Sequence, residues 1–418
     1  MKKKKKILVI SDSPLVPSGV GTQTRYFIDS LLKTGEFSFF CLAGAIKHKD
    51  YRLQKVEPYG EDWMILPVDG YGTQDLIRQV LRDYKPDLLW FMTDPRFYIW
   101  LWDIDSEIRK NVPMMYYHVW DNYPLPHFNK IYYDSNDVVC TISKVTDDIV
   151  KNVSPEVESI RVPHTVDTEM FSKKKQEQIN NQRNAITTDH EDKLIFFWNN
   201  RNARRKQSGT LIFWFKEFLD KVGHDKAVLL MHTEPKDQNG QDLIAIMNNL
   251  NLMNGEVLIS REKISPEDLS LVYNACDCTI NISDAEGFGL STLESLATET
   301  PIIVNMTGGL QEQVTNGEDS FGYGIEPSSK AIIGSQDVPW IYEDRINKED
   351  FLEVMFNFYN LSPEERADLG RKGRQHVLDN YGFESFSNQW REVINNTIEK
   401  HGSWESRKNY KHWSFTEL

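Results

Sequence analysis

Short apolar runs alternate with segments of helical periodicity along most of the chain. Continuous apolar runs of about four to eight residues are typical of strands buried on both faces of a parallel sheet. Such strands alternating with helices indicate βαβ units, so the pattern predicts two doubly wound α/β sheets with helices on both faces. The predicted strands cover residues 7–11, 37–43, 63–68, 87–92, 113–119, 138–143 and 159–163, followed by 194–198, 227–232, 256–259, 278–282 and 301–305.

The C-terminal part of the chain follows a different pattern. Residues 317–324 predict a glycine-rich loop, and residues 328–342 predict an irregular segment. The aromatic residues of the tail from residue 403 onward are expected to dock onto a domain surface; they are Trp404, Tyr410, Trp413 and Phe415. The predicted helices of the second half cover residues 207–222, 241–249, 266–275, 290–298, 348–359, 363–379 and 384–399.

A chain of 418 residues exceeds the size at which one hydrophobic core usually keeps growing, so two domains are expected. Between residues 173 and 192 the chain becomes rich in Lys, Gln, Asn and Asp, which predicts an interdomain linker. The predicted organisation is therefore an N-terminal domain at 1–172, a linker at 173–192, a C-terminal domain at 193–382 and a C-terminal segment at 383–418.

The formal net charge of −14 opposes nonspecific attraction to nucleic-acid phosphates over most of the surface. A run of lysines at residues 2–6 predicts either a solvated leader to the first strand or a peripheral contact with anionic lipid. The apolar run at 7–10 is too short for a signal peptide or a membrane span. We therefore expect a cytoplasmic protein without a transmembrane segment.

No metal site is predicted from the cysteine or carboxylate spacing. Cysteines lie in apolar stretches without the paired spacing of a zinc site and are predicted to be buried free thiols; they are Cys41, Cys140, Cys276 and Cys278. Asp103 and Asp105 have the D-x-D spacing of a metal-binding loop, but residues 97–110 have the pattern of an amphipathic helix.

In an open α/β sheet, ligands bind beyond the carboxyl ends of the strands, so the loops there are the candidate binding segments. After the first strand, Gly19-x-Gly21 lies in a small-residue loop that opens a helix, which would let backbone N–H groups approach a phosphate or a sugar. The third glycine of a dinucleotide fingerprint is absent, because Thr24 occupies that position. A bare turn is the alternative interpretation.

After the strand at 194–198, four cations fall within six residues where a loop enters a helix; they are Arg201, Arg204, Arg205 and Lys206. Cations at a helix N-terminus oppose the helix dipole, so a compensating anion is expected there. A diphosphate would satisfy this requirement. The alternative is a solvated basic turn.

The segment 283–294 has the most specific pattern. A strand ends, Glu286 and two glycines follow, and a helix begins near Leu290, whose free N–H groups could bind phosphate. Glu286 and Glu294 could accept hydrogen bonds from hydroxyl groups. The alternative is that Glu294 only caps the first helical turn and Glu286 lies in a solvated loop.

These residues carry a resemblance to a known family. Glu286-x7-Glu294 within EGFGLSTLESLA resembles the signature of the GT4 family of retaining glycosyltransferases, the glycosyl transferases group 1. Arg201-x4-Lys206 is similar to the family's diphosphate-binding pair, residues 162–167 to its P-x-G-V-D turn and residues 308–312 to its GG-x-x-E loop. The resemblance covers nearly the whole chain, but Thr165 and Asn200 occupy positions where the family has glycine.

The resemblance implies a GT-B fold, in which two Rossmann-like domains face each other across a cleft and a C-terminal helix crosses back to the N-terminal domain. It also implies an enzyme that moves a hexosyl or pentosyl group from a UDP-, GDP- or ADP-linked sugar to an acceptor hydroxyl, with retention and without a metal or cofactor. A dehydrogenase would need the full glycine fingerprint, which the chain lacks. A degenerate sugar-binding protein is disfavoured, because the charged motif residues are present.

The family's roles transfer to matching positions. Glu286 would hold sugar hydroxyls, Glu294 the ribose hydroxyls, and Arg201 with Lys206 the leaving diphosphate. His118 matches the family's active-site histidine, with Asp121 to orient it, although a core histidine is the alternative. The remaining residues of the implied donor site are Gly19, Gly21, Phe288, Gly289, Leu290 and Ser291.

The acceptor would be bound by loops of the N-terminal domain that are rich in Tyr, Trp and Asp. The residues assigned to it are Asp94, Trp120, Asp121 and Tyr123. Family members typically build polysaccharides or lipid-linked glycans, so a glycan or lipid-linked acceptor is expected. The alternative is DNA with hydroxymethylated bases, as in viral enzymes of this fold, with the base flipped into a local basic patch.

Overall fold

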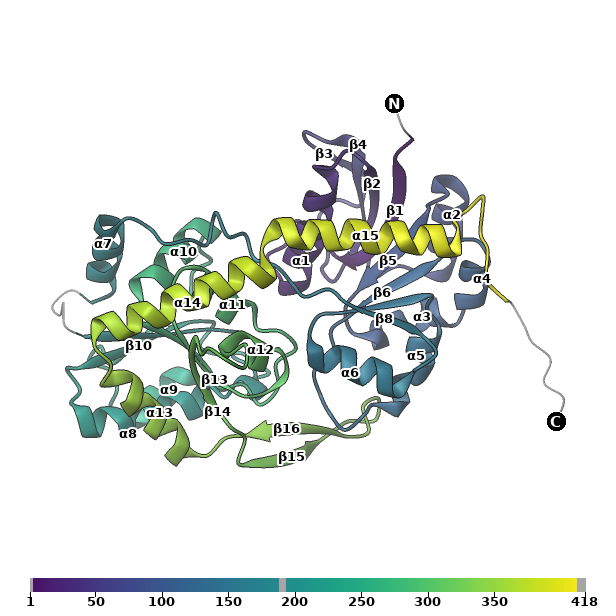
Figure 1. Ribbon diagram of the computed structural model, residues 1–418. Helices are drawn as coiled ribbons and strands as arrows, with labels where there is room; N and C mark the ends of the chain where they lie inside the picture. The colour runs from purple at the N-terminus through teal and green to yellow at the C-terminus, as the bar shows by residue number, and fades with distance from the viewer. Residues whose placement is uncertain (1–2, 188–192, 412–418) are drawn as a thin grey trace. The chain divides into compact units, whose positions relative to one another are not determined.

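The computed structural model describes residues 3–187 and 193–411 (Figure 1). These residues form two compact units, each with its own parallel sheet. The first unit consists of the residues up to Thr165, residues 335–339 and the residues from Phe383 onward. The second unit consists of residues 166–334 and 340–382. The chain therefore passes from one unit to the next at Thr165, earlier than the linker expected at 173–192.

The first unit contains an eight-stranded sheet in the order β3-β4-β2-β1-β5-β6-β7-β8. β3 pairs antiparallel with β4, and the other neighbours pair in parallel, which confirms the predicted α/β class. The apolar pattern does not predict β3, because its residues Gln54 and Lys55 are exposed. The strands are β1 (Lys5–Asp12), β2 (Phe37–Gly44), β3 (Gln54–Val56), β4 (Gly60–Pro67), β5 (Leu88–Met92), β6 (Met114–His118), β7 (Val138–Thr141) and β8 (Glu158–Arg161).

The helices of the first unit include one from the C-terminal part of the chain. They are α1 (Gly19–Leu32), α2 (Gln74–Tyr84), η1 (Pro95–Tyr98), α3 (Ile99–Trp102), α4 (Asp105–Arg109), η2 (His127–Asn129), α5 (Lys130–Asp134), α6 (Lys144–Val153) and α15 (Phe383–His401). In Figure 1, α15 is the long yellow helix that lies beside α1.

The core of the first unit is rich in aromatic side chains, and α15 contributes one of them. Phe27 of α1 stacks on Trp90 of β5 with ring centroids 4.3 Å apart. Trp390 of α15 is fully buried and lies edge-on to Phe27 at 4.9 Å. It also lies edge-on to Tyr117 of β6 at 4.9 Å and to Trp90 at 6.0 Å. A helix from the end of the chain therefore completes a core that the first strands begin.

The tail beyond α15 docks in part on the first unit. The guanidinium of Arg109 lies 5.0 Å from the ring centroid of Tyr410, and that of Arg407 lies 5.4 Å from it. Arg407 also donates to the carboxylate of Asp137 at 2.6 Å. Trp404 is half-buried. The other two tail aromatics, Trp413 and Phe415, lie outside the described residues.

The second unit contains a six-stranded parallel sheet in the order β11-β10-β9-β12-β13-β14. Its strands are β9 (Leu194–Asn199), β10 (Ala227–His232), β11 (Val257–Ser260), β12 (Cys278–Asn281), β13 (Ile302–Asn305) and β14 (Gly322–Ile325). Its helices are α7 (Gln176–Ile186), η3 (Arg204–Lys206), α8 (Ser208–Val222), α9 (Leu243–Asn249), α10 (Pro266–Ala275), α11 (Leu290–Ala297), η4 (Gly308–Leu310), α12 (Gln311–Val314), α13 (Lys348–Tyr359) and α14 (Pro363–Tyr381). The core packs α8 and α13 against one face of the sheet.

Two segments differ from the sequence-based expectation. The polar segment 173–192 is not a continuous linker, because it contains α7, which packs on α10 and buries Ile179. Arg183 of α7 pairs with Asp277 at 2.9 Å, so α7 belongs to the second unit. The apolar pattern did not predict this helix, because most of its residues are polar and exposed. Residues 188–192 lie outside the described residues.

The expected loop at 317–324 and irregular segment at 328–342 contain strands. β14 begins at Gly322, where an added Cβ would lie 1.9 Å from the carbonyl oxygen of Ile302 on β13. Glycine is therefore required for the pairing of β13 with β14, although a glycine makes a strand harder to predict from the sequence. Beyond it, β15 (Ser329–Ile333) and β16 (Ile341–Arg345) form an antiparallel hairpin outside the six-stranded sheet (Figure 1).

Several smaller predictions can be compared with the structure. The four cysteines are buried and free, as predicted. The single amphipathic helix expected at residues 97–110 is instead divided into η1, α3 and α4, and Asp103 follows the end of α3 while Asp105 begins α4. Residues 3–187 and 193–411 contain no group of three His, Cys, Asp or Glu placed to hold a metal ion. Within the same ranges, no helix has both the length and the apolarity needed to cross a bilayer.

The packing of Trp390 predicts a large loss of stability on truncation. Trp390→Ala is expected to lower the free energy of unfolding by about 3–5 kcal/mol, because it leaves a cavity among buried rings. Ile131→Ala on α5, where the side chain is 66% exposed, is the control and should change it by less than about 0.5 kcal/mol. Urea unfolding followed by tryptophan fluorescence measures both. A loss equal to that of the control would show that α15 does not contribute to this core.

Candidate functional site

The candidate site lies at the carboxyl edge of the second sheet, where the loops after β9 and β12 meet. β9 and β12 are neighbours in the sheet, so their following loops leave it side by side. The backbone N–H of Asp284 donates to the carbonyl oxygen of Arg205 at 2.8 Å, and the Arg205 guanidinium donates to the carbonyl oxygen of Ala285. The two predicted motif segments therefore form one continuous surface.

Lys206 and Glu286 form an ion pair between these two loops. Their side chains are only 10% and 13% exposed. Burial opposes the ionisation of Glu286, but the charges of Lys206 and Arg205 outweigh it, so the pKa of Glu286 is lowered. Glu286 is therefore ionised at neutral pH in a poorly solvated place, where its attraction to Lys206 is stronger than it would be in water.

Glu294 lies on α11 in a different electrostatic environment. Burial raises the pKa of Glu294 to about 7, and a hydrogen bond from the Tyr273 hydroxyl at 2.8 Å opposes that shift. The side-chain amide of Asn199, at the end of β9, donates to the Tyr273 hydroxyl at 2.9 Å. Glu294 is thus connected to the same strand end as Lys206, but it carries only part of a charge near neutral pH.

Glycines allow the backbone around Glu286 to pack closely. Gly308 has a φ of 49°, and an added Cβ there would lie 1.9 Å from the carbonyl oxygen of Glu286. The N–H of Gly309 donates to the same oxygen at 3.1 Å. Gly289 has a φ of 92° and caps α11, and its Cβ would lie 2.5 Å from Leu310. The G-G-x-x-E segment therefore supports the backbone of Glu286.

Three further donor-site residues of the prediction lie in or beside this loop. Phe288 is buried, and its ring lies edge-on to Tyr381 of α14 at 5.7 Å, so it acts in packing. Leu290 and Ser291 are half-buried in the first turn of α11. Their backbone N–H groups, with that of Gly289, lie at the end of the helix where an anion is favoured.

The cations of the segment 201–206 point to different partners. The guanidinium of Arg201 is 63% exposed and donates twice to Asp237, at 2.7 and 3.1 Å. Arg204 donates to Glu343, and Lys206 to Glu286. The structure therefore pairs Lys206 with Glu286 between the two loops and connects Glu294, on α11, to the end of β9 through Tyr273. The Arg201 side chain is instead held by Asp237 in the loop after β10.

His118 lies in the core of the first unit and not at its surface. The side chain is fully buried, and burial lowers its pKa to about 3. The Tyr133 hydroxyl lies 2.7 Å from Nε2, and the Tyr116 hydroxyl lies 3.1 Å from Nδ1. Because Tyr116 donates to the carbonyl oxygen of Thr93, it accepts from Nδ1, which assigns the proton to that nitrogen. The core interpretation of His118 agrees better with this geometry than contact with a sugar.

Two of the residues expected to contact the acceptor, Asp94 and Trp120, lie beside Arg96. Arg96 donates to Asp94, and its guanidinium lies 5.2 Å from the ring centroid of Trp120. Trp120 is buried, Asp121 is half-buried, and Tyr123 is 38% exposed. The loop that ends at Arg96 was expected to take part in acceptor binding, but the sequence did not indicate that Arg96 would pair with Asp94 and lie beside Trp120.

Gly19 and Gly21 begin α1 at the carboxyl end of β1. An added Cβ on Gly21 would lie 2.7 Å from the carbonyl oxygens of Ser13 and Val16, so this glycine is needed for close packing of the loop. Ser18 accepts from the Gly21 N–H at 2.9 Å and donates to Asp12 at 2.7 Å. The loop is therefore ordered by its own contacts, which fits either interpretation of the Gly19-x-Gly21 pair.

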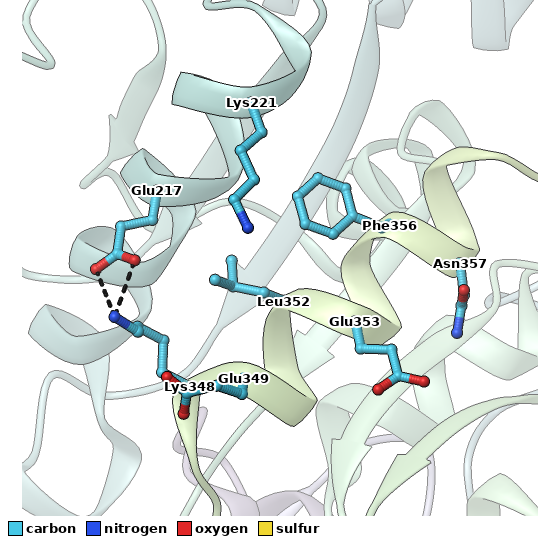
Figure 2. Close-up of a pocket in the computed structure, with 8 residues that line it drawn as sticks. All are labelled: Glu217, Lys221, Lys348, Glu349, Leu352, Glu353, Phe356 and Asn357. Atoms are coloured by element: carbon cyan, nitrogen blue, oxygen red, sulfur yellow. Dashed lines mark hydrogen bonds and ion pairs between the residues drawn. The ribbon is translucent and has the colours of Figure 1, made fainter.

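A separate hollow of about 460 Å³ lies between α8 and α13. Figure 2 shows Leu352 and Phe356 forming its apolar part, with Lys221 above Phe356 and with Lys348 paired to Glu217. The predicted site residues do not line this hollow.

Comparison with solved structures defines the class of fold. The chain superposes on sucrose-phosphate synthase from Thermosynechococcus elongatus with a TM-score of 0.74 and 16% identity, covering 95% of this chain and 100% of that chain. It superposes on HepE from Anabaena, solved in complex with UDP and glucose, with a TM-score of 0.68 and 13% identity, covering 94% and 100%. The predicted GT-B fold is confirmed.

Sequence comparison finds similarity over part of the chain. Residues 178–375 match the family Glycosyl transferases group 1. Alpha-monoglucosyldiacylglycerol synthase from Streptococcus pneumoniae is 26% identical over 206 residues, which are 48% of this chain and 44% of that protein. The match thus spans less than half the length of this relative. The range that matches this family model contains Lys206, Glu286 and Glu294.

The environment of Glu294 predicts a pH-dependent stability. Its pKa is about 7 in the folded protein against an ordinary value of 4.5, so the folded state holds a proton that the unfolded chain releases between these pH values. The contribution of Glu294 to the free energy of unfolding therefore falls as the pH rises from about 4.5 to about 7, by up to about 3 kcal/mol. Glu294→Gln, which has no charge to bury, is expected to gain stability relative to wild type from pH 4.5 to pH 8.

Denaturant unfolding across this pH range measures the difference between Glu294→Gln and wild type. Tyr273→Phe is the matched variant, because it removes the hydrogen bond that favours the charged carboxylate and should move the transition to higher pH. If the difference in the free energy of unfolding between Glu294→Gln and wild type does not change with pH, the raised pKa of Glu294 is contradicted.

Proposed function

We propose that this protein is a glycosyltransferase that moves a glycosyl group from a nucleoside-diphosphate sugar to an acceptor hydroxyl. The observation that carries the proposal is the buried pair of Lys206 and Glu286, which places a cation and a carboxylate beside the N-terminus of α11. A diphosphate needs positive charge and N–H donors, and a sugar needs carboxylate acceptors, so this arrangement suits both parts of the donor.

The diphosphate would be held by Lys206 and by the N–H groups of Gly289 and Leu290. Negative charge grows on the diphosphate as the glycosidic bond breaks, and preorganised donors in a poorly solvated site stabilise that charge strongly. Donor binding would move the ammonium of Lys206 from the Glu286 carboxylate toward the phosphate oxygens. Arg201 would contribute by turning its exposed guanidinium from Asp237 to the same phosphates.

The two carboxylates would hold the sugar parts of the donor. Glu286 is ionised and would accept hydrogen bonds from hydroxyls of the transferred sugar, whereas Glu294 on α11 would accept from the ribose. With a pKa of about 7, Glu294 accepts best above neutral pH, when it is charged. Assays are therefore best begun near pH 8.

The family resemblance supports transfer with retention. In that reaction the bond from the anomeric carbon to the leaving phosphate oxygen breaks, the acceptor oxygen bonds to the same face of that carbon, and the acceptor proton passes to a phosphate oxygen. No side chain is then needed as a base, which agrees with the burial of His118.

UDP-glucose is the first donor to test, because the similar HepE structure was solved with UDP and glucose. UDP at about 100 times its Kd should stabilise the wild type by about 2.7 kcal/mol. Arg201→Ala and Glu294→Ala are expected to lose most of this effect, and Lys206→Gln is expected to lower kcat by about 100-fold to 1000-fold. Thermal unfolding with UDP, GDP and ADP, and release of UDP, measure these changes.

Lys216→Gln is the matched control for Lys206→Gln. Lys216 pairs with Asp220 on α8, away from both site loops, so its replacement should leave nucleotide binding and turnover unchanged. The proposal fails if none of the three nucleoside diphosphates raises the melting temperature of the wild type.

For the acceptor we propose a lipid or a lipid-linked sugar. The relative from Streptococcus pneumoniae is named for a glucosylated diacylglycerol, and the loops after β5 and β6 expose aromatic groups such as Tyr123 and Phe97. Aromatic side chains can contact both sugar rings and acyl chains. The net charge of −14 disfavours DNA, which serves as a comparison substrate.

Tyr123→Ala tests this assignment of the acceptor loops. The side chain is 38% exposed, so its loss should raise the acceptor KM by about tenfold and leave UDP affinity unchanged. The assay offers UDP-glucose with diacylglycerol vesicles, with soluble oligosaccharides, or with hydroxymethylated DNA. Transfer to DNA alone would reject the lipid assignment, and an unchanged acceptor KM would remove Tyr123 from the acceptor site.

A further inference from the structure

The hairpin formed by β15 and β16 carries a run of charged residues at its end. Glu343, Asp344 and Arg345 are consecutive on β16, which lies outside the six-stranded sheet. Lys330 of β15 donates to Asp344 at 2.8 Å, and Thr307, just before η4, donates to the other oxygen of Asp344 at 2.8 Å. The end of the hairpin is therefore fixed to the second unit by polar contacts.

β16 holds the loop that carries Glu286. Arg345 pairs with Asp284 at 2.9 Å, and the backbone N–H of Asp344 donates to the carbonyl oxygen of Asp284 at 2.8 Å. The side-chain amide of Asn305 donates to the carbonyl oxygens of Ser283 and Asp344, at 2.9 and 3.0 Å. These contacts fix the chain two residues before Glu286.

β16 also holds the loop that carries Lys206. The two terminal nitrogens of Arg204 donate to the two oxygens of Glu343, at 2.8 and 2.5 Å. Arg204 begins η3, the single turn that ends with Lys206. The same Glu343 carboxylate accepts from Arg345 at 2.9 Å. One carboxylate therefore connects both site loops through two arginines.

The burial of Glu343 makes this connection strong. The Glu343 side chain is 2% exposed, and bidentate hydrogen bonds between a guanidinium and a carboxylate are among the strongest in proteins. Glu343 is the buried member of this cluster, whereas the Arg204 side chain is 54% exposed and that of Arg345 is 31% exposed. The Glu343 carboxylate is therefore the fixed point on which the two guanidinium groups converge.

We propose that the hairpin of β15 and β16 positions the donor site, and that Glu343 is the positioning residue which holds Lys206 and Glu286 opposite each other. Glu343 acts through Arg204 on one loop, and through Arg345 and Asp284 on the other. The proposal deepens the proposed function and rests on it, since it takes a nucleoside diphosphate as the ligand of these loops.

The test compares UDP affinity in the full chain by calorimetry. Glu343→Gln is expected to weaken UDP binding by about tenfold, because the two arginines lose their charged partner. Glu343→Asp keeps the charge and should recover most of the affinity. In hydrogen exchange without ligand, Glu343→Gln should speed exchange at residues 200–207 and 283–289 and leave the rest of the second sheet unchanged.

Glu217→Gln is the matched control, since it removes a half-buried carboxylate whose partner Lys348 lies on α13 (Figure 2). Its UDP affinity should equal that of the wild type. Arg204→Gln is the second variant, because its side chain is 54% exposed and its loss leaves the core packing intact. It is expected to weaken UDP binding in the same direction as Glu343→Gln.

The outcomes separate the two proposals. If the wild type binds UDP and both Glu343→Gln and Arg204→Gln bind it within twofold of wild type, the positioning role is wrong and the proposed function stands. If Glu343→Gln does not fold, Arg204→Gln alone decides by the same criterion. If the wild type binds no nucleoside diphosphate, the proposed function is wrong and the positioning role is rejected with it.

Discussion

The buried ion pair of Lys206 and Glu286 is the contact on which the proposed donor site of the second unit depends. It joins loops from two neighbouring strands, and its burial makes either charge costly without the other. The contacts around it serve to keep the two loops in place: Gly308 and Gly309 support the backbone of Glu286, and Glu343 connects Arg204 with Arg345. The pair thus keeps the two loops of the proposed donor site together in the absence of a ligand.

The alternating sheets and the two site loops could be predicted because local sequence encodes them. Buried parallel strands are continuous apolar runs, and the loops after them contain the charged motif residues. The hairpin of β15 and β16 could not be predicted in this way, because its strands are half-exposed and its charged contacts reach Arg204, 139 residues away. The helix α7 was missed for a related reason, since it is mostly polar and buries Ile179 alone of its residues.

The partners of the site residues also lay beyond the reach of sequence patterns. The Tyr273 hydroxyl opposes the rise in the pKa of Glu294 and lies 21 residues before it, and Asp237 holds Arg201 from 36 residues further along the chain. His118 had two interpretations, a contact with sugar or a place in the core, and the choice depends on burial, which a single sequence does not display. Sequence indicated candidate site residues, and packing determines the electrostatic environment of groups such as Glu286 and Glu294.

The position of α15 in the first unit has a consequence for how the protein is made. Phe27, Trp90 and Tyr117 emerge early from the ribosome, but Trp390, which fills the space between them, is synthesised several hundred residues later. The second unit has its whole sheet available before that time, since its strands end at Ile325. Domains generally fold as units during synthesis. The N-terminal sheet is therefore synthesised long before the helix that completes its core, and its apolar surface stays uncovered by α15 until that helix is made.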